Sequence, residues 1–181
     1  MGETTIKSPA GRDLHLVATK STTPSSNNTV KHIDVARETV EVLVSDSRII
    51  SKGSQFGHVA ISIDGTVYGR AHPGWDIAAR DAYLKRQQIN MHRATWGYVL
   101  MVSKEEKAKM LADIKKRAAA NEPYSLDSNS CSSNIAEVLE FAGIPAYDPR
   151  WSGFTMISPA DLMVGLSHSR RLIQKNTYAP K

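Results

Sequence analysis

The sequence predicts an α+β domain, in which a small antiparallel sheet is covered by packed helices. Three observations support this class. The segment TVEVLVSD (39–46) alternates apolar and polar residues, and GHVAISIDGTVYGRAH (57–72) reads as two strands joined at a turn. The segment that begins at Cys131 repeats its apolar residues with a helical period instead.

The chain of 181 residues fits one domain with a buried core. Its composition, 41% hydrophobic and 23% charged, is ordinary for a globular protein. Residues 1–37 are rich in Ser, Thr, Asn and Lys, and we expect a flexible N-terminal leader there with one short strand at Leu14–Val17. Residues 38–181 are expected to form the single folded domain.

Strands are expected at three places in that domain. The first is residues 39–46. The second is a hairpin within residues 57–72, because Asp64-Gly65 is a strong two-residue turn signal. The third, WGYVLMVS at residues 96–103, is almost wholly apolar, which favours a central position in the sheet.

A helix is expected directly after that third strand. Ser103 and Glu106 match the S-x-x-E pattern of a capping box, and the helix should close near Pro123. Charge pairs four residues apart and an apolar stripe support it. They come from Glu105/Lys109, Asp113/Arg117, Leu111, Ile114 and Ala118.

Two further helices are expected near the C-terminus. In the first, apolar residues recur on one face and Gly143 marks the end. That face consists of Cys131, Ile135, Val138, Leu139 and Ala142. The second spans residues 158–166, with Ser158 as N-cap and Pro159 at the first helical position.

Cys131, the single cysteine, lies in the first turn of its predicted helix. The first N–H groups of a helix have no intrahelical partner and carry partial positive charge, which stabilises a thiolate and can hold an oxyanion. Cys131 is therefore a candidate nucleophile. The competing interpretation is a small buried hydrophobe. One cysteine excludes an internal disulfide framework and a thiolate zinc cluster.

His58 is the candidate base, because it opens a strand directly after Gly57 and a neutral imidazole can take the thiol proton. A surface histidine is the alternative. A two-residue hairpin pairs His58 with Ala71, whereas a three-residue loop pairs it with His72, whose ring could then orient the first. Asp76 could take this orienting role instead if the strand bulges, and neither residue is the remaining alternative.

The other histidines show no link to Cys131. A zinc site built from His58, His72 and Cys131 lacks a close-set ligand pair, so we expect neither metal nor cofactor. Three tryptophans could line a cleft but are more often core residues. The residues concerned are His15, His32, His92, His168, Trp75, Trp96 and Trp151.

The net charge of +5 favours anionic surroundings, yet the basic residues are scattered and read as a solvated surface. No basic–aromatic recognition motif appears, so nucleic-acid binding is not expected. No segment has the apolar length of a membrane span, and the N-terminus lacks the layout of a secretory signal. We therefore expect no stable membrane insertion, and synthesis in the cytoplasm without a signal peptide.

Three motifs in this order resemble the circularly permuted branch of the papain-like NlpC-type cysteine peptidases, which includes cell-wall hydrolases and lecithin:retinol acyltransferase-like proteins. They are GHVAISIDGTVYGRAH, NSCSSNIAEVLEFAGI and SPADL, within residues 39–166. The resemblance implies a papain-like catalytic domain with Cys131 as nucleophile, His58 as base and His72 as orienter. Tyr124 resembles the tyrosine that lines the cleft. The 14-residue spacing from His58 to His72 is longer than the family pattern leads us to expect.

Short proteins of this type also resemble type VI secretion effectors. The resemblance implies an antibacterial toxin that is secreted into the target-cell periplasm and cleaves amide bonds in peptidoglycan stems. A cognate immunity protein and a component of the secretion apparatus are the implied partners. Two alternatives remain, a thioester-forming lipid acyltransferase or phospholipase, and a binding module without catalysis.

Overall fold

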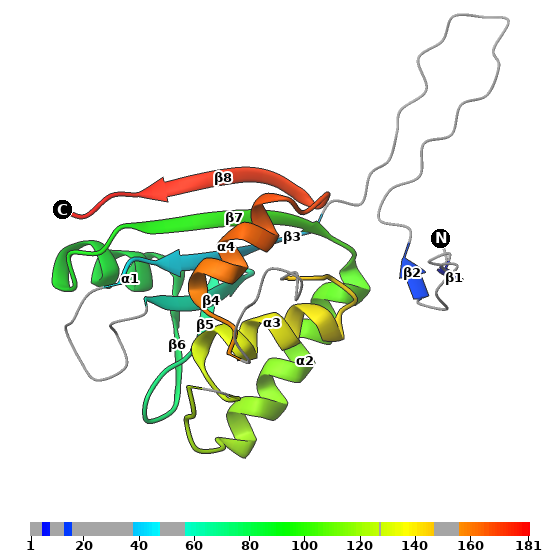
Figure 1. The fold of residues 1–181 in the computed structure, drawn as a ribbon, viewed down its shortest axis with the longest axis horizontal. Helices are drawn as coiled ribbons and strands as arrows, with labels where there is room; N and C mark the ends of the chain where they lie inside the picture. Colours follow the sequence, from blue (N-terminus) through cyan, green and yellow to red (C-terminus); the bar gives the residue numbers. More distant parts are fainter. Residues whose placement is uncertain (1–4, 8–12, 16–37, 48–56, 127, 147–155) are drawn as a thin grey trace, which may run out of the picture.

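The fold is taken from a computed structural model of the whole chain, in which residues 5–7, 13–15, 38–47, 57–126, 128–146 and 156–181 are described. Its main body is a six-stranded sheet with helices on both faces, so the predicted α+β class is confirmed (Figure 1). Every pair of neighbouring strands in this sheet is antiparallel.

The strands of the sheet lie in the order β6-β5-β4-β3-β7-β8. They are β3 (Glu38–Ser45), β4 (His58–Ile63), β5 (Thr66–Arg70), β6 (Trp75–Ala79), β7 (Thr95–Val102) and β8 (Leu172–Tyr178). A separate two-stranded ladder joins β1 (Thr5–Lys7) to β2 (Asp13–His15). The leader thus holds a strand pair where one strand at Leu14–Val17 was predicted, and most of residues 1–37 lies outside the described part.

Four α-helices accompany the sheet among the described residues. They are α1 (Arg80–Lys85), which runs into a π-helical turn (Arg86–Asn90), α2 (Lys104–Ala120), α3 (Cys131–Phe141) and α4 (Pro159–Ser167). The caps explain three of the starts. Ser103, Ser130 and Ser158 each accept a hydrogen bond from the third backbone N–H of the helix that follows. The predicted capping box at Ser103 and Glu106 is confirmed.

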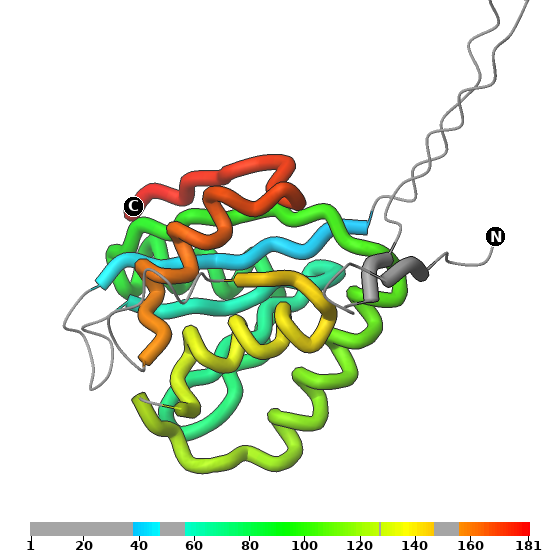
Figure 2. Tube along the Cα trace, turned by 45° about the vertical axis from the view of Figure 1, so that its right-hand side comes forward, coloured from blue at the N-terminus to red at the C-terminus, as the bar shows by residue number. Residues whose placement is uncertain are grey.

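The helices divide between the two faces of the sheet. One face of β4 and β3 meets α2, α3 and α4 in the main core, and Figure 2 shows these helices on the same side. The other face holds a smaller core under α1. Successive side chains of β4 point to opposite faces of the sheet. Val59 and Ile61 therefore belong to the main core, and Ala60 belongs to the smaller core.

The predicted hairpin and central strand are both confirmed. Ile63 pairs with Thr66, so the turn has two residues, and Asp64 and Gly65 both have positive φ as a type I′ turn requires. Strand β7 lies between β3 and β8. Strand β6, helix α1 and strand β8 had no counterpart in the sequence prediction.

Candidate active site

Cys131 is the first residue of α3, and its side chain is buried at the N-terminal end of that helix. Ser130 caps the helix and shares a reciprocal capping box with Ser133, whose hydroxyl accepts from the Ser130 N–H at 2.9 Å. The Ser132 hydroxyl lies 3.8 Å from the sulfur. The predicted first-turn position is confirmed, and the thiol therefore faces the positive end of the helix dipole.

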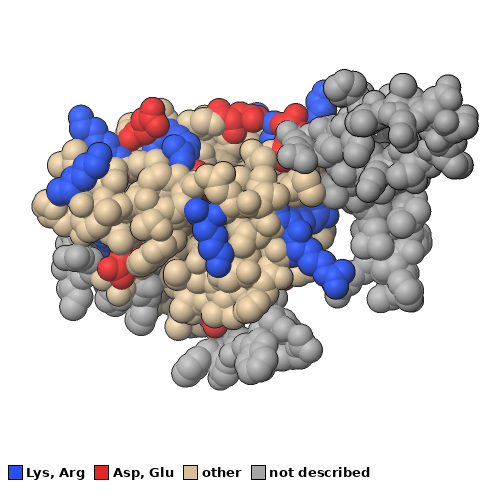
Figure 3. All heavy atoms as spheres, turned by 90° about the horizontal axis from the view of Figure 1, so that it is seen from above, with Lys and Arg blue, Asp and Glu red and all other residues tan. Residues whose placement is uncertain are grey.

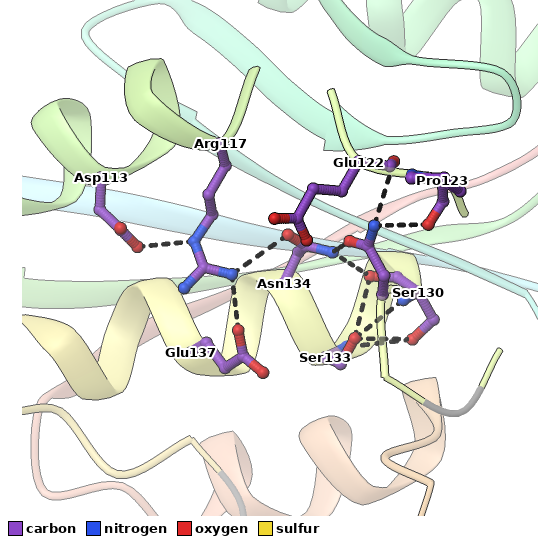
Figure 4. A network of polar contacts seen from close by, with 9 residues as sticks. Asp113, Arg117, Glu122, Pro123, Ser130, Ser133, Asn134 and Glu137 are labelled. Atoms are coloured by element: carbon purple, nitrogen blue, oxygen red, sulfur yellow. Dashed lines mark hydrogen bonds and ion pairs between the residues drawn. The ribbon is translucent and has the colours of Figure 1, made fainter. Parts of the chain in front are cut away.

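A polar network fixes the chain that enters this helix (Figure 4). The Asn134 amide donates to the Ser130 carbonyl at 2.9 Å and to the Asn129 side chain at 2.7 Å. Asn129 in turn donates to the Pro123 carbonyl at 2.7 Å. Arg117 of α2 donates to Asn134 at 3.3 Å. Because these bonds join α2, the loop and α3, the position of Cys131 is set by three segments of the chain.

His58 is brought next to Cys131, as the helix-and-hairpin interpretation requires. Burial by itself raises the pKa of the Cys131 thiol. The hydrogen bond and charge of His58 oppose this effect, with help from the Val59 N–H and the Ser132 hydroxyl, and lower the pKa to about 7. A substantial fraction of the sulfur is therefore thiolate near neutral pH, which is the nucleophilic form.

Two glycines determine how His58 is placed, one through the path of the backbone and the other through the space it leaves for the ring. Gly57 has φ of +87°, and a Cβ there would lie 2.7 Å from the Ser45 carbonyl oxygen, so only glycine lets the chain enter β4 in this way. A Cβ at Gly69 would lie 3.0 Å from His58 Nε2. The imidazole thus extends over the bare backbone of Gly69. On this face of the sheet its ring centroid is 6.5 Å from that of Tyr83.

Asp76 lies on the same face of the sheet as His58. Ala60 pairs with Gly69, and Gly69 pairs with Asp76, so the side chains of these positions point to one side. Directly paired residues have Cβ positions about 5 Å apart, and His58 Nε2 already lies over the middle position. Arg86 holds the Asp76 carboxylate in an ion pair. The anchored carboxylate of Asp76 therefore lies on the same face as the imidazole, and the β5–β6 pairing shows no bulge.

The predicted pairing of His72 with His58 is wrong. The two-residue turn sets the register so that Ala60 pairs with Gly69, and continuing this register puts Ala71 opposite His58. His72 is exposed and lies against Tyr124, with ring centroids 6.2 Å apart in an edge-to-face arrangement. The ring at position 72 therefore packs against Tyr124, which lies beside the Cys131 thiol.

Tyr124 places its phenol oxygen at the start of α3. Burial and the nearby Cys131 sulfur raise the pKa of Tyr124 to about 12, while the Cys131 N–H bonds to its oxygen. The phenol consequently stays protonated at neutral pH and keeps a donor beside the sulfur. The Arg70 guanidinium lies 5.6 Å from the ring centroid and donates to the Glu122 carbonyl at 2.5 Å. Arg70 is buried and ties this loop to the end of β5.

A partly open pocket of about 340 Å³ lies against the sulfur. Its walls come from the start of α3, the preceding loop and the start of α4. The lining residues are Gly57, Tyr124, Leu126, Ser130, Cys131, Ser132, Met156, Ile157, Ser158 and Pro159. None of these side chains is charged at neutral pH apart from the thiolate, and aliphatic and aromatic groups dominate the wall.

The remaining candidates lie away from the thiol or outside the described residues. Trp75 and Trp96 pack against the main core, whereas Trp151 is not described. His92 is exposed and bonds to the Lys181 carbonyl, and His168 follows α4. Within the described ranges, no three His, Cys, Asp or Glu residues are grouped closely enough to hold a metal ion.

Several residues of this site had no role in the sequence prediction. Gly69 carried a usable signal, because glycine inside a strand often marks a close approach by another group. Arg86, Asn129 and Asn134 act through contacts between distant segments, which no local pattern reveals. The pocket residues Met156 and Ile157 lie in an irregular stretch before α4, so no periodicity identifies them.

The charged surface agrees with the scattered pattern of the sequence. On the face in Figure 3, Lys and Arg side chains are separated by uncharged ones and mixed with acidic ones. No helix in the described part of the chain has the length and apolarity that crossing a membrane demands.

Comparisons with known proteins agree with this architecture. The Lnb N-terminal periplasmic domain matches residues 75–163, a range that contains Cys131 but not His58. The crystal structure of a type VI secretion system effector, TseH, matches with a TM-score of 0.53 and 16% sequence identity. The match covers 74% of this chain and 90% of the effector chain. The comparison with curated proteins finds no match.

The structural likeness establishes the fold of the chain. The α+β architecture is similar to that of TseH, and along this chain the histidine strand β4 precedes the cysteine helix α3.

Proposed function

We propose that this chain is a cysteine hydrolase that cleaves an amide bond in the peptide stems of peptidoglycan. The observation that carries the proposal is the pairing of His58 with Cys131 at a helix N-terminus, where the thiol pKa falls to about 7. The fold of a type VI secretion effector supports action as an antibacterial toxin. Similarity to a domain described as periplasmic supports action on the cell wall.

The first half of the proposed cycle forms a thioester. His58 takes the thiol proton, and the thiolate attacks the scissile carbonyl carbon, forming a C–S bond. The carbonyl oxygen becomes an oxyanion beside the Cys131 N–H and the Tyr124 hydroxyl, which both lie at the start of α3. Collapse of this intermediate breaks the C–N bond, and the His58 proton goes to the leaving amine.

The second half releases the product. A water molecule attacks the thioester carbonyl while His58 takes its proton. The C–S bond then breaks, which frees a carboxylic acid and regenerates the thiol and the neutral imidazole. The net reaction consumes one water per amide bond and needs no cofactor.

Asp76 is the residue we assign to orient His58, in place of His72. Because Nε2 lies over Gly69 on the Asp76 side, Nδ1 is the ring atom left to face the sulfur. A carboxylate near Nε2–H fixes this tautomer and stabilises the imidazolium that forms during the reaction. Arg86 holds that carboxylate in place through an ion pair.

Replacing Gly69 with alanine tests this arrangement of the ring. The new methyl group would lie 3.0 Å from His58 Nε2 and 3.2 Å from the Ala60 Cβ, so it would push the ring away from its position over the strand. We expect kcat to fall by roughly 10²-fold, since misplacing a catalytic group by about 1 Å costs that much. Steady-state hydrolysis measures the effect.

Gly74→Ala is the matched control for this variant. A Cβ at position 74 meets its nearest neighbour, Asn121, at 3.4 Å, which is an ordinary contact. Its kcat should stay within about twofold of the wild type. If Gly69→Ala retains full activity with an unchanged melting temperature, the ring does not work from its position over Gly69.

Digestion of purified sacculi tests the proposed substrate. The protein should release soluble muropeptides, and mass spectrometry of new amine and carboxyl ends identifies the bond. A parallel incubation with phospholipid vesicles examines the second candidate, lipid acyl transfer or phospholipid hydrolysis through the same thioester. The apolar lining of the pocket beside Cys131 is the observation that favours this candidate. Lysolipid or free fatty acid without muropeptides would replace the wall substrate with a lipid.

The effector proposal also implies partners. A cognate immunity protein would protect the producing cell, and a component of the secretion apparatus would bind the toxin for delivery. Both partners follow from the proposed role as an antibacterial toxin. Co-expression of an immunity protein that inhibits the cysteine site should relieve the toxicity of this chain in the periplasm.

A further inference from the structure

The pocket beside Cys131 does not include the imidazole of His58 in its wall. Cys131 lines the pocket, whereas His58 is not among its lining residues and instead extends over Gly69. The amine that leaves must approach His58, because it receives its proton there. The pocket is therefore placed to hold the other half of the substrate, the acyl residue that stays attached to the sulfur.

The chemistry of the wall restricts that acyl residue. Leu126, Met156, Ile157 and Pro159 supply aliphatic surface, and Tyr124 supplies its ring. The hydroxyls of Ser130 and Ser158 are occupied by their helix caps. Among the described residues, no cationic side chain lines the pocket to pair with a carboxylate, and burying an unpaired charge is costly. A neutral apolar group is the one that this wall accepts.

The pocket is partly open to solvent, and an apolar residue of its wall is exposed. Leu126 is a large apolar residue, yet it is 39% exposed, and it lies on the pocket wall. A ligand there would cover it.

We propose that this pocket, the acyl pocket, selects substrates whose acyl group is an amino-acid residue with a neutral, apolar side chain, as in alanine. This inference rests on the proposed amidase function and narrows it. Peptide stems that present alanine on the carbonyl side of the scissile bond fit the acyl pocket. A glutamyl acyl residue would place its free carboxylate against an apolar wall.

Chloromethyl ketone probes measure the selectivity without any wall substrate. The thiolate displaces chloride from the probe methylene and forms a thioether, which the intact mass of the protein reports. The probes are N-acetyl-alanyl, N-acetyl-glutamyl and decanoyl chloromethyl ketones. Each rate is divided by the iodoacetamide rate of the same protein, so that differences in thiolate content cancel. We expect the alanyl probe to react at least about tenfold faster than the glutamyl probe.

Two matched variants assign the selectivity to the acyl pocket. Leu126→Asp should reduce the preference for the alanyl over the glutamyl probe by several fold, because it places a charge on the wall. Val164→Asp introduces the same charge at another exposed apolar residue, on α4 and outside the pocket, and its preference should match the wild type.

The outcomes separate this inference from the proposed function. Equal normalised rates for the alanyl and glutamyl probes would overturn the acyl pocket while leaving a reactive nucleophile. A faster decanoyl probe would also overturn it, in favour of a lipid acyl group. A thiol that resists iodoacetamide even at pH 8 would instead contradict the hydrolase proposal itself.

Discussion

Cys131→Ala is expected to abolish hydrolysis of sacculi, with a loss of at least about 10³-fold in kcat. The sulfur is the atom that forms the covalent intermediate, and no second cysteine exists to replace it. The substitution keeps a small apolar side chain at a position that is 6% exposed. The capping box of Ser130 and Ser133 does not involve the thiol, so α3 should still begin at the same residue. Release of soluble muropeptides measures the loss.

Ile135→Val is the matched control for this variant. Ile135 lies one turn further along α3 and is fully buried, so its shortening removes comparable volume from the same helix without touching the sulfur. It should lower the free energy of unfolding by about 1 kcal/mol and leave kcat nearly unchanged. Muropeptide release by Cys131→Ala at the wild-type rate would place the chemistry of the chain at another residue.

Local patterns were sufficient for the elements that carry Cys131 and His58, the proposed nucleophile and base. The helical period through Cys131 and Ile135 predicted the buried face of α3, since one face of this helix meets the sheet. Asp64-Gly65 predicted the hairpin, because both residues take the positive φ that the turn demands. These signals act within a few residues, so the sequence displays them directly.

Strand β8 escaped prediction because its stability comes from distant partners. Its residues are mostly polar and exposed, as expected for an edge strand. Tyr178 and Asn176 each donate to Glu41 of β3 at 2.7 Å, and Arg80 of α1 donates to the same carboxylate at 2.8 Å. Gly97 makes space for this carboxylate, since a Cβ there would lie 2.1 Å from Glu41 Oε1. No window of sequence contains this set of contacts.

The expected pairing of His72 with His58 depended on the register of the hairpin. Adding one residue to the turn moves the partner of His58 from Ala71 to His72, and sequence alone left both turns open. The structure has the shorter turn. Asp76 lies on β6, a short and half-exposed edge strand whose residues show no alternating pattern, so the sequence did not predict this strand. Helix α1 follows it without a side-chain cap, so its start also lacked a signal.

His58→Asn is expected to lower kcat by about 10²- to 10⁴-fold, the usual contribution of a general acid–base group. It should also change the thiol itself. Burial raises the pKa of Cys131, and the hydrogen bond and charge of His58 are the largest opposing effects. Without the imidazole, the pKa should rise from about 7 toward or above the free-thiol value of about 8.5. Because thiolate is the reactive form, alkylation should then require a higher pH.

The pH dependence of iodoacetamide labelling shows whether His58 or the N-terminus of α3 lowers the pKa of Cys131. In the wild type the labelling rate should rise with pH and reach half its plateau near pH 7. His168→Asn makes the same substitution at an exposed histidine after α4, and its midpoint should stay near 7. If the His58→Asn midpoint also stays there, the N-terminus of α3 alone acidifies the sulfur. His58 would then be a neighbour of the thiol without being its base, and the hydrolytic cycle would lose its proton carrier.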